Sequence, residues 1–229
     1  MNTMVRRVEL FLLMLLITCS TAMAGTIYFA DFEGTVGSEW STTSTATTPA
    51  GCTTCTTFLG EFSNDTVVLT LSGLTPGVHV SISFDLFIIR SWDGNGESGW
   101  GPDTWTITLG DNTSYTYTFA NGDGNTQTYP VANSSPGTGA IAENTLGYSF
   151  GTDQRDSAYR LTYSWYNPSD TATITFSASG LQGLSGFGYA DELWGLDNVQ
   201  MTANPEPSTA ILLGTGVLAF ILYRRQKRA

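Results

Sequence analysis

Apolar and polar residues alternate with a period of two along most of this chain, which is the pattern of β-strands that bury one face. The longest such segment runs from Val78 to Ile88, where every second residue is apolar and most of the residues between are polar. Shorter segments of the same kind occupy 67–71, 105–109, 115–119, 159–165 and 172–178. Turn sequences rich in Gly, Pro, Asn and Asp separate them at 74–77, 110–112, 121–124 and 167–170.

About ten strands without an internal repeat predict an all-β fold, namely a two-sheet antiparallel sandwich wired as a jelly roll. The segment 78–90 should lie in the middle of a sheet, because its apolar face is continuous. No helical period of useful length occurs before the C-terminal segment. The body is therefore expected to be one sandwich domain over residues 25–203, long enough for a substantial core.

The N-terminus departs from the strand pattern. Arg6 and Arg7 precede an apolar run at 10–17, and Ala22-Met23-Ala24 offers a small-x-small cleavage site before Gly25. This order predicts a secretory signal peptide over residues 1–24. Lipoprotein processing at Cys19 is an alternative, because the three residues before it loosely match a lipobox.

The C-terminus combines a chain breaker, an apolar segment and a basic end. Pro205, Glu206 and Pro207 precede the apolar stretch 209–223 and the basic tail 224–229. About 15 helical residues reach roughly 22 Å, which is short of a ~30 Å hydrocarbon core. Tyrosine and long basic side chains at the end can still reach the interface. We therefore predict a transmembrane helix over 209–223 with its basic tail in the cytoplasm.

Residues 204–229 resemble the PEP-CTERM sorting signal of Gram-negative bacteria, which consists of a Pro-Glu-Pro triplet, one hydrophobic helix and an arginine-rich end. The resemblance implies a partner enzyme, an exosortase, that acts at or near the triplet. It further implies export through the inner membrane, anchoring by the C-terminal helix before processing, and delivery to the cell surface or extracellular matrix. A plain tail anchor is the alternative interpretation.

The body is acidic and poor in the residues that catalysis commonly uses. Residues 25–203 hold three of the nine basic and 18 of the 20 acidic residues, which gives a net charge of −15. Such a surface repels nucleic acid, so no nucleic-acid partner is expected. The body contains no lysine and a single histidine, His79, and the chain lacks a zinc-protease helix motif or a phosphate-binding loop. We therefore predict that the protein is not an enzyme.

Cys52 and Cys55 lie three positions apart in a Ser/Thr-rich stretch, 41–57. A redox pair would favour a helix N-terminus, and a zinc site would need two further ligands, for which His79 is the one candidate. In an oxidising compartment a local disulfide is the favoured interpretation.

Acidic residues also mark the two ends of the body, at Asp31-Phe32-Glu33-Gly34 and Asp197-Asn198-Val199. These segments resemble jelly-roll carbohydrate-binding modules, which open with a Phe-Glu segment and close with an Asp-Asn-Val strand. In those folds the first and last strands are neighbours and often hold a structural Ca²⁺. The resemblance implies Asp31, Glu33 and Asp197 as calcium ligands. The alternative is that the two aspartates cap turns or accept backbone hydrogen bonds.

The loop 91–103 carries two tryptophans among acidic and amide residues. Its calcium-loop pattern, which starts at Asp93, fails at the twelfth position, where Thr104 replaces the bidentate glutamate. Indole faces can pack on sugar rings while carboxylates and amides take the hydroxyls. The predicted ligand-binding set is Trp92, Asp93, Asn95, Glu97, Trp100 and Asp103. The alternative is that both indoles cover an end of the sandwich.

These observations together predict an exported, non-catalytic surface or matrix protein that binds exopolysaccharide and contains structural calcium. A purely structural surface protein without a specific ligand is one alternative. A polysaccharide hydrolase is another, although paired carboxylates in so acidic a chain carry little information.

Overall fold

The computed structural model describes residues 25–204, except 98, 123, 184, 185 and 187, together with the C-terminal positions 216, 223, 224 and 227. The predicted signal peptide, the Pro-Glu-Pro triplet and nearly all of the predicted transmembrane helix lie outside the described residues. Within the described part of the chain, no helix is long and apolar enough to cross a membrane. The body forms one compact unit, Thr26–Thr202.

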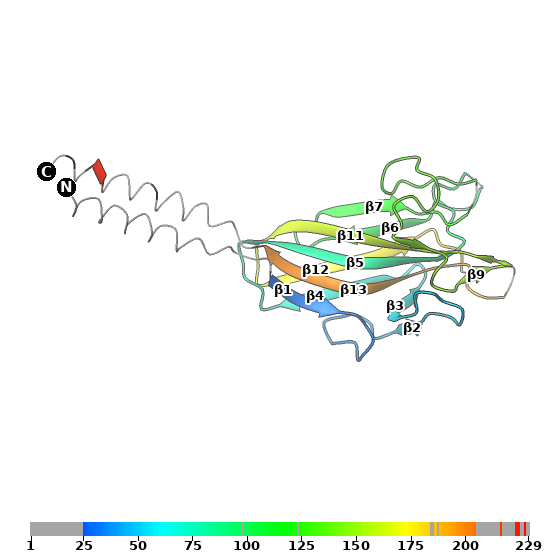
Figure 1. Ribbon diagram of the computed structural model, residues 1–229, viewed down its shortest axis with the longest axis horizontal. Helices are drawn as coiled ribbons and strands as arrows, with labels where there is room; N and C mark the ends of the chain where they lie inside the picture. Colours follow the sequence, from blue (N-terminus) through cyan, green and yellow to red (C-terminus); the bar gives the residue numbers. More distant parts are fainter. Residues whose placement is uncertain are drawn as a thin grey trace, which may run out of the picture. The chain divides into compact units, whose positions relative to one another are not determined.

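Two sheets face each other in this unit (Figure 1). The larger sheet has seven strands, in the order β2-β3-β13-β5-β11-β8 with β1 paired to β13. Its strands are β1 (Gly25–Ala30), β2 (Thr45–Thr47), β3 (Thr57–Phe62), β5 (Val78–Arg90), β8 (Ala142–Glu143), β11 (Asp156–Asn167) and β13 (Glu192–Asn204). The smaller sheet has the order β4-β12-β6-β7, from β4 (Thr66–Ser72), β12 (Thr171–Ser179), β6 (Thr104–Thr108) and β7 (Ser114–Thr118). A separate hairpin pairs β9 (Ser149–Phe150) with β10 (Asp153–Gln154).

The prediction of an all-β, two-sheet sandwich is confirmed. The β11–β5, β12–β4, β12–β6 and β6–β7 pairs are antiparallel. From β3 to β13 the chain passes repeatedly from one sheet to the other, which is the connectivity expected of the predicted jelly roll. As expected, β5 lies between β13 and β11, and β1 lies beside β13.

The core between the sheets is built from the apolar residues of the alternating segments. Phe84 of β5 packs against Trp105 of β6 and Phe176 of β12, with ring centroids 5.7 and 5.3 Å apart. Trp105 also meets Trp194 of β13 edge to face. All four side chains are buried, and such aromatic contacts stabilise a core beyond the area that they bury.

A second apolar cluster covers part of the outer face of the larger sheet. Phe87 and Ile89 of β5 point away from the main core and pack with Leu146, Tyr148 and Leu193 in this cluster. Both faces of β5 are therefore buried near its C-terminal end, where 84–89 are all buried. Strict alternation ends there, because loops cover the face that would otherwise meet solvent.

Long loops gather at one end of the sandwich, which we call the loop end and define by the segments 91–103, 119–155 and 180–191 (Figure 1). It is the end where β5 finishes and β13 begins, as the hydrogen bond from the Trp92 indole to the Leu193 carbonyl shows. The 13 residues of β13 extend about 40 Å from there. The strand β13 therefore ends at the end of the sandwich opposite these loops.

Candidate functional site

The loop end contains a polar cavity of about 320 Å³, here called the loop-end cavity. Carboxylate, amide and guanidinium side chains from four segments of the chain line it. The lining residues are Asn121, Gly122, Pro136, Gly137, Glu143, Asn144, Asp153, Gln154, Arg155 and Asp156.

Two of these side chains hold the walls of the cavity in place. Asp156 is buried and accepts three backbone N–H groups, those of Thr145, Leu146 and Tyr148, at 2.8, 3.0 and 3.1 Å. The Asn121 amide donates to the carbonyls of Ile88 and Arg90 at 3.0 and 2.9 Å. These contacts use most of the hydrogen-bonding capacity of Asp156 and Asn121, so their role in the cavity is to fix its shape.

Other lining residues face solvent. Glu143, Asp153 and Gln154 are exposed, and Arg155 is half-buried with its guanidinium 5.7 Å from the Phe150 ring. One Arg155 nitrogen lies 4.0 Å from the Asp153 carboxylate. Donors and acceptors thus converge on one opening, an arrangement suited to hydroxyl-bearing ligands. Sequence reasoning missed this site, although Arg155 is one of only three basic residues in the body.

The predicted ligand-binding loop is divided between the core and the surface. Trp92 is fully buried; its indole nitrogen donates to the Leu193 carbonyl at 2.8 Å and its ring meets Phe119 edge to face. Asp103 is also fully buried. The prediction that Trp92 and Asp103 contact a surface ligand is therefore wrong, because neither side chain reaches solvent.

Trp100 is the loop tryptophan that a ligand can reach, with 66% of the residue exposed. Asn95 and Glu97 face the neighbouring loop: the Asn95 amide donates to the Thr126 hydroxyl at 2.7 Å, and the Thr126 N–H donates to Glu97 at 3.0 Å. The hydrogen bonds from Thr126 lower the pKa of Glu97. Asn95 and Glu97 therefore fix the loop through hydrogen bonds with Thr126, whereas the exposed Trp100 indole is accessible to a ligand.

Asp93 lies with Asp103 and Glu192 in a cluster that sequence reasoning did not assemble. Oxygens of the three carboxylates lie within 4.8 Å of one another. Burial raises the pKa of Asp103 to about 6. Burial, together with the neighbouring Asp103 charge, raises the pKa of Glu192 to about 10. Burial and mutual repulsion therefore disfavour the charged forms of Asp103 and Glu192, while Asp93 is only partly buried.

The three calcium ligands predicted from the two ends of the body, Asp31, Glu33 and Asp197, are here called the end-joining set. Two of them lie at one hydroxyl group. Thr56 Oγ1 lies 2.8 Å from Glu33 Oε1 and 2.9 Å from Asp197 Oδ2, and its single proton can serve only one of them. Asp31 instead accepts the Glu33 N–H at 3.3 Å in a local turn. Burial raises the pKa of Asp197 to about 6, whereas hydrogen bonds from Thr57 and Thr56 lower that of Glu33.

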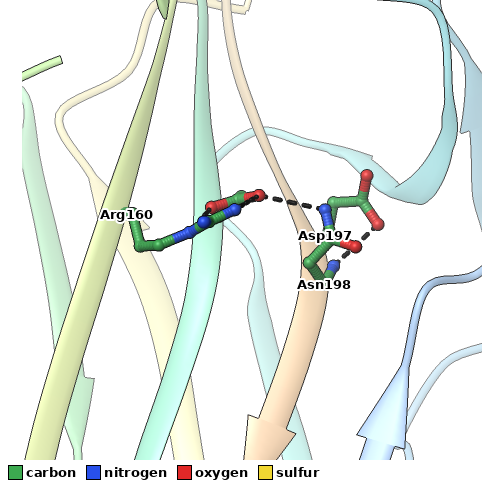
Figure 2. A network of polar contacts seen from close by, with 4 residues as sticks. Arg160, Asp197 and Asn198 are labelled. Carbon is green, nitrogen blue, oxygen red and sulfur yellow. Dashed lines mark hydrogen bonds and ion pairs between the residues drawn. The ribbon is translucent and has the colours of Figure 1, made fainter. Parts of the chain in front are cut away.

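Asp197 also belongs to a polar network across the central strands of the larger sheet (Figure 2). Arg160 of β11 makes two 2.8 Å hydrogen bonds to Asp85 of β5. The Asn198 side chain donates to the same carboxylate at 3.0 Å, and the Asn198 N–H donates to Asp197 at 2.7 Å. The buried Asp85 charge is thus paired and hydrogen-bonded, as a buried charge must be.

Two further sequence features are located by the structure. Cys52 and Cys55, the predicted pair, form a disulfide. Residues 147–151 read Gly-Tyr-Ser-Phe-Gly, which matches the nucleophile-elbow pattern of hydrolases. Ser149, however, lies in a short hairpin rather than a strand-to-helix turn, and His79 contacts Tyr166 near the start of β5, far from the loop end. The serine therefore lacks the context that such a nucleophile needs.

Comparison with known families identifies the C-terminus. Residues 205–228 match the PEP-CTERM protein-sorting motif. This match confirms the resemblance of the Pro-Glu-Pro segment and implies an exosortase-sorted surface protein. No curated protein matches this chain.

Solved structures similar to the body include carbohydrate-binding-module-like β-sandwich domains. The carbohydrate-binding module CBM28, specific for non-crystalline cellulose, is 15% identical over 73% of this chain and 89% of its own, with a TM-score of 0.38. A family 35 carbohydrate-binding module from Clostridium thermocellum is 9% identical over 79% and 98%, with a TM-score of 0.33. Latent PorU from Porphyromonas gingivalis is 9% identical over 65% of this chain but only 11% of its own, with a TM-score of 0.35. Sequence identities and TM-scores this low do not indicate which ligand or activity this chain has.

Proposed function

We propose that this protein is a non-catalytic, exosortase-sorted surface or matrix protein whose loop end binds an exopolysaccharide. In this proposal a signal peptide directs its export, the C-terminal helix holds it in the inner membrane before processing, and the sandwich is then displayed. The sorting motif at 205–228 supports the route. The loop-end cavity is the observation that carries the binding step.

The size and lining of the cavity favour a sugar. Its volume of about 320 Å³ lies at the lower end of the range for small-ligand sites. Exposed carboxylate and amide groups of Glu143, Asp153 and Gln154 can accept and donate hydrogen bonds to ring hydroxyls. The net charge of −15 on the body opposes a polyanion, so the proposed ligand is a neutral polysaccharide.

A second surface can extend the contact. The Asn121 N–H at the cavity donates to the Trp92 carbonyl at 3.0 Å, and this places the cavity wall against the start of the loop that carries Trp100. An exposed indole packs on the apolar faces of sugar rings. In the proposal, a polymer longer than one ring contacts both the cavity and Trp100.

Retention of the purified full-length protein on immobilised polysaccharides tests this function. We expect retention on at least one neutral glucan or mannan, weakened by Asp153→Asn with Gln154→Ala and separately by Trp100→Ala. Asp170→Asn and Tyr166→Ala are the matched controls, because they remove the same group types from exposed positions at the other end of the sandwich. Failure of every polymer to retain the protein would contradict the binding step and favour a purely structural protein.

Calcium at the end-joining set stays part of the proposal. Glu33 and Asp197 supply carboxylates on either side of Thr56, and Ca²⁺ binds such oxygens. Asp197→Asn should then lower the melting temperature in Ca²⁺ but not in chelator. An equal effect in both conditions would assign Asp197 to hydrogen bonding alone.

A further inference from the structure

A buried site at the loop end has the composition of a divalent-cation centre. Asp93 lies in the loop after β5, Asp103 directly precedes β6, and Glu192 opens β13. The residues are up to 99 positions apart in the chain, yet their carboxylate oxygens lie within 4.8 Å of one another. Asp103 and Glu192 are both 0% exposed, which is uncommon for acidic residues that lack a charged partner.

The hydrogen bonds of the two buried carboxylates use only one oxygen of each. One oxygen of Asp103 accepts the Asp93 N–H, and one oxygen of Glu192 accepts the Gln182 N–H. The second oxygen of each, Asp103 Oδ1 and Glu192 Oε1, is buried and has no hydrogen-bond donor. Buried polar atoms are nearly always satisfied, so two such atoms in one cluster call for a partner.

Protein cations do not supply that partner. The ion pairs formed within the described part of the chain join Arg155 to Asp153 and Arg160 to Asp85. The Arg90 guanidinium lies over the rings of Tyr148 and Tyr189 and donates to the Ala190 carbonyl. Neither of these ion pairs involves the buried carboxylates of Asp103 and Glu192.

We propose that Asp93, Asp103 and Glu192 form a Ca²⁺ site. All of the candidate ligands are oxygens, which suits a hard cation; Ca²⁺ accepts flexible oxygen coordination, whereas Mg²⁺ requires near-octahedral geometry. This site is separate from the end-joining set, none of whose residues takes part in it. The proposal does not depend on carbohydrate binding.

The proposed ion would connect separate segments of the chain at the loop end. It joins the beginning and the end of the 91–103 loop to the first residue of β13. Asn125 extends the connection to the next loop, because its amide donates to Asp93 at 3.0 Å. Without the ion, repulsion among the carboxylates opposes this arrangement, and with it the placement of Trp100.

Metal titration of the purified full-length protein tests the site. After removal of bound metal with chelator, Ca²⁺ binding is measured by calorimetry and Tb³⁺ binding by luminescence excited through tryptophan, since Trp92 adjoins Asp93 in the chain. We expect Asp103→Asn and Glu192→Gln each to lose one bound ion per chain. Asp191→Asn is the matched control, because it removes a neighbouring charge outside the cluster, and it should keep that ion.

Two comparisons make the result decisive. Asp197→Asn should retain the ion that Asp103→Asn loses, which separates this site from the end-joining set. Near-UV circular dichroism in chelator should show that both cluster variants fold. Equal numbers of bound ions in wild type and in both cluster variants would overturn the proposal. Absence of binding to the wild type would do so as well, and would indicate that the carboxyl groups share a proton instead.

Discussion

Replacing Glu192 with glutamine should affect the stability of the protein differently with and without Ca²⁺. The substitution keeps the size of the side chain but removes its charge. In chelator the glutamine should stabilise the fold, because it ends the repulsion with Asp93 and Asp103 and offers an N–H donor to the buried Asp103 Oδ1. In Ca²⁺ it should remove a ligand.

The expected magnitude follows from the geometry. Two charges 4.8 Å apart repel each other by about 3.5 kcal/mol at an effective dielectric constant of about 20. If Glu192 instead takes up a proton at pH 7, starting from its ordinary pKa of 4.5, the cost is again about 3.4 kcal/mol. The variant should therefore be about 3 kcal/mol more stable than the wild type in chelator, roughly 6–12 °C in melting temperature.

Calcium should reverse this order. An ion that binds only the folded wild type at 1,000 times its dissociation constant adds about 4 kcal/mol. The wild type should then exceed the variant by about 1 kcal/mol. Thermal unfolding followed by near-UV circular dichroism, with Asp191→Asn as control, measures both differences. A variant that is less stable than the wild type in chelator, or a Ca²⁺ response equal in the two proteins, would refute the reasoning.

Three further predictions concern the packing of the loop tryptophans, the hydrogen bonds of Asp156 and the disulfide. Trp92→Ala should lower the free energy of unfolding by about 3–5 kcal/mol, because the Trp92 indole is fully buried. Trp100→Ala should change it by less than about 0.5 kcal/mol, because Trp100 is exposed. Equal losses in denaturant unfolding would contradict these placements. Asp156→Ala should cost about 3 kcal/mol or more in the same assay, because three backbone N–H groups lose their acceptor, and a neutral result would mean that water replaces it. Serine at both Cys52 and Cys55 should cost only about 2 kcal/mol, because the disulfide closes a very short loop, and a much larger loss would assign it a wider structural role.

The strands that were predictable from the sequence are those with one buried face. Val67, Leu69 and Leu71 alternate with less buried residues in β4, and the same holds for most of β12. β3 was missed because Phe58, Leu59 and Gly60 are buried in succession, so its pattern carries no period of two. The two-residue strands β8, β9 and β10 are too short to show any period.

The candidate sites depend on contacts between distant segments, which local patterns do not report. Trp92 and Trp100 occupy similar sequence surroundings, yet Trp92 is buried against Phe119 with its indole bonded to the Leu193 carbonyl, whereas Trp100 is exposed. Asp93 and Asp103 could be found in the loop, but Glu192 joins them only because β13 begins where β5 ends. The C-terminal motif was recognised because its order of residues is itself the signal.

Binding of a neutral oligosaccharide at the loop-end cavity is the central claim, and calorimetric titration of the purified full-length protein tests it most directly. The oligosaccharide is prepared from a polysaccharide that retains the wild type. We predict saturable binding at one site per chain, lost when Asp153→Asn and Gln154→Ala are combined and preserved in Asp170→Asn. No heat of binding to the wild type, or the same affinity in the cavity variant, would contradict the claim.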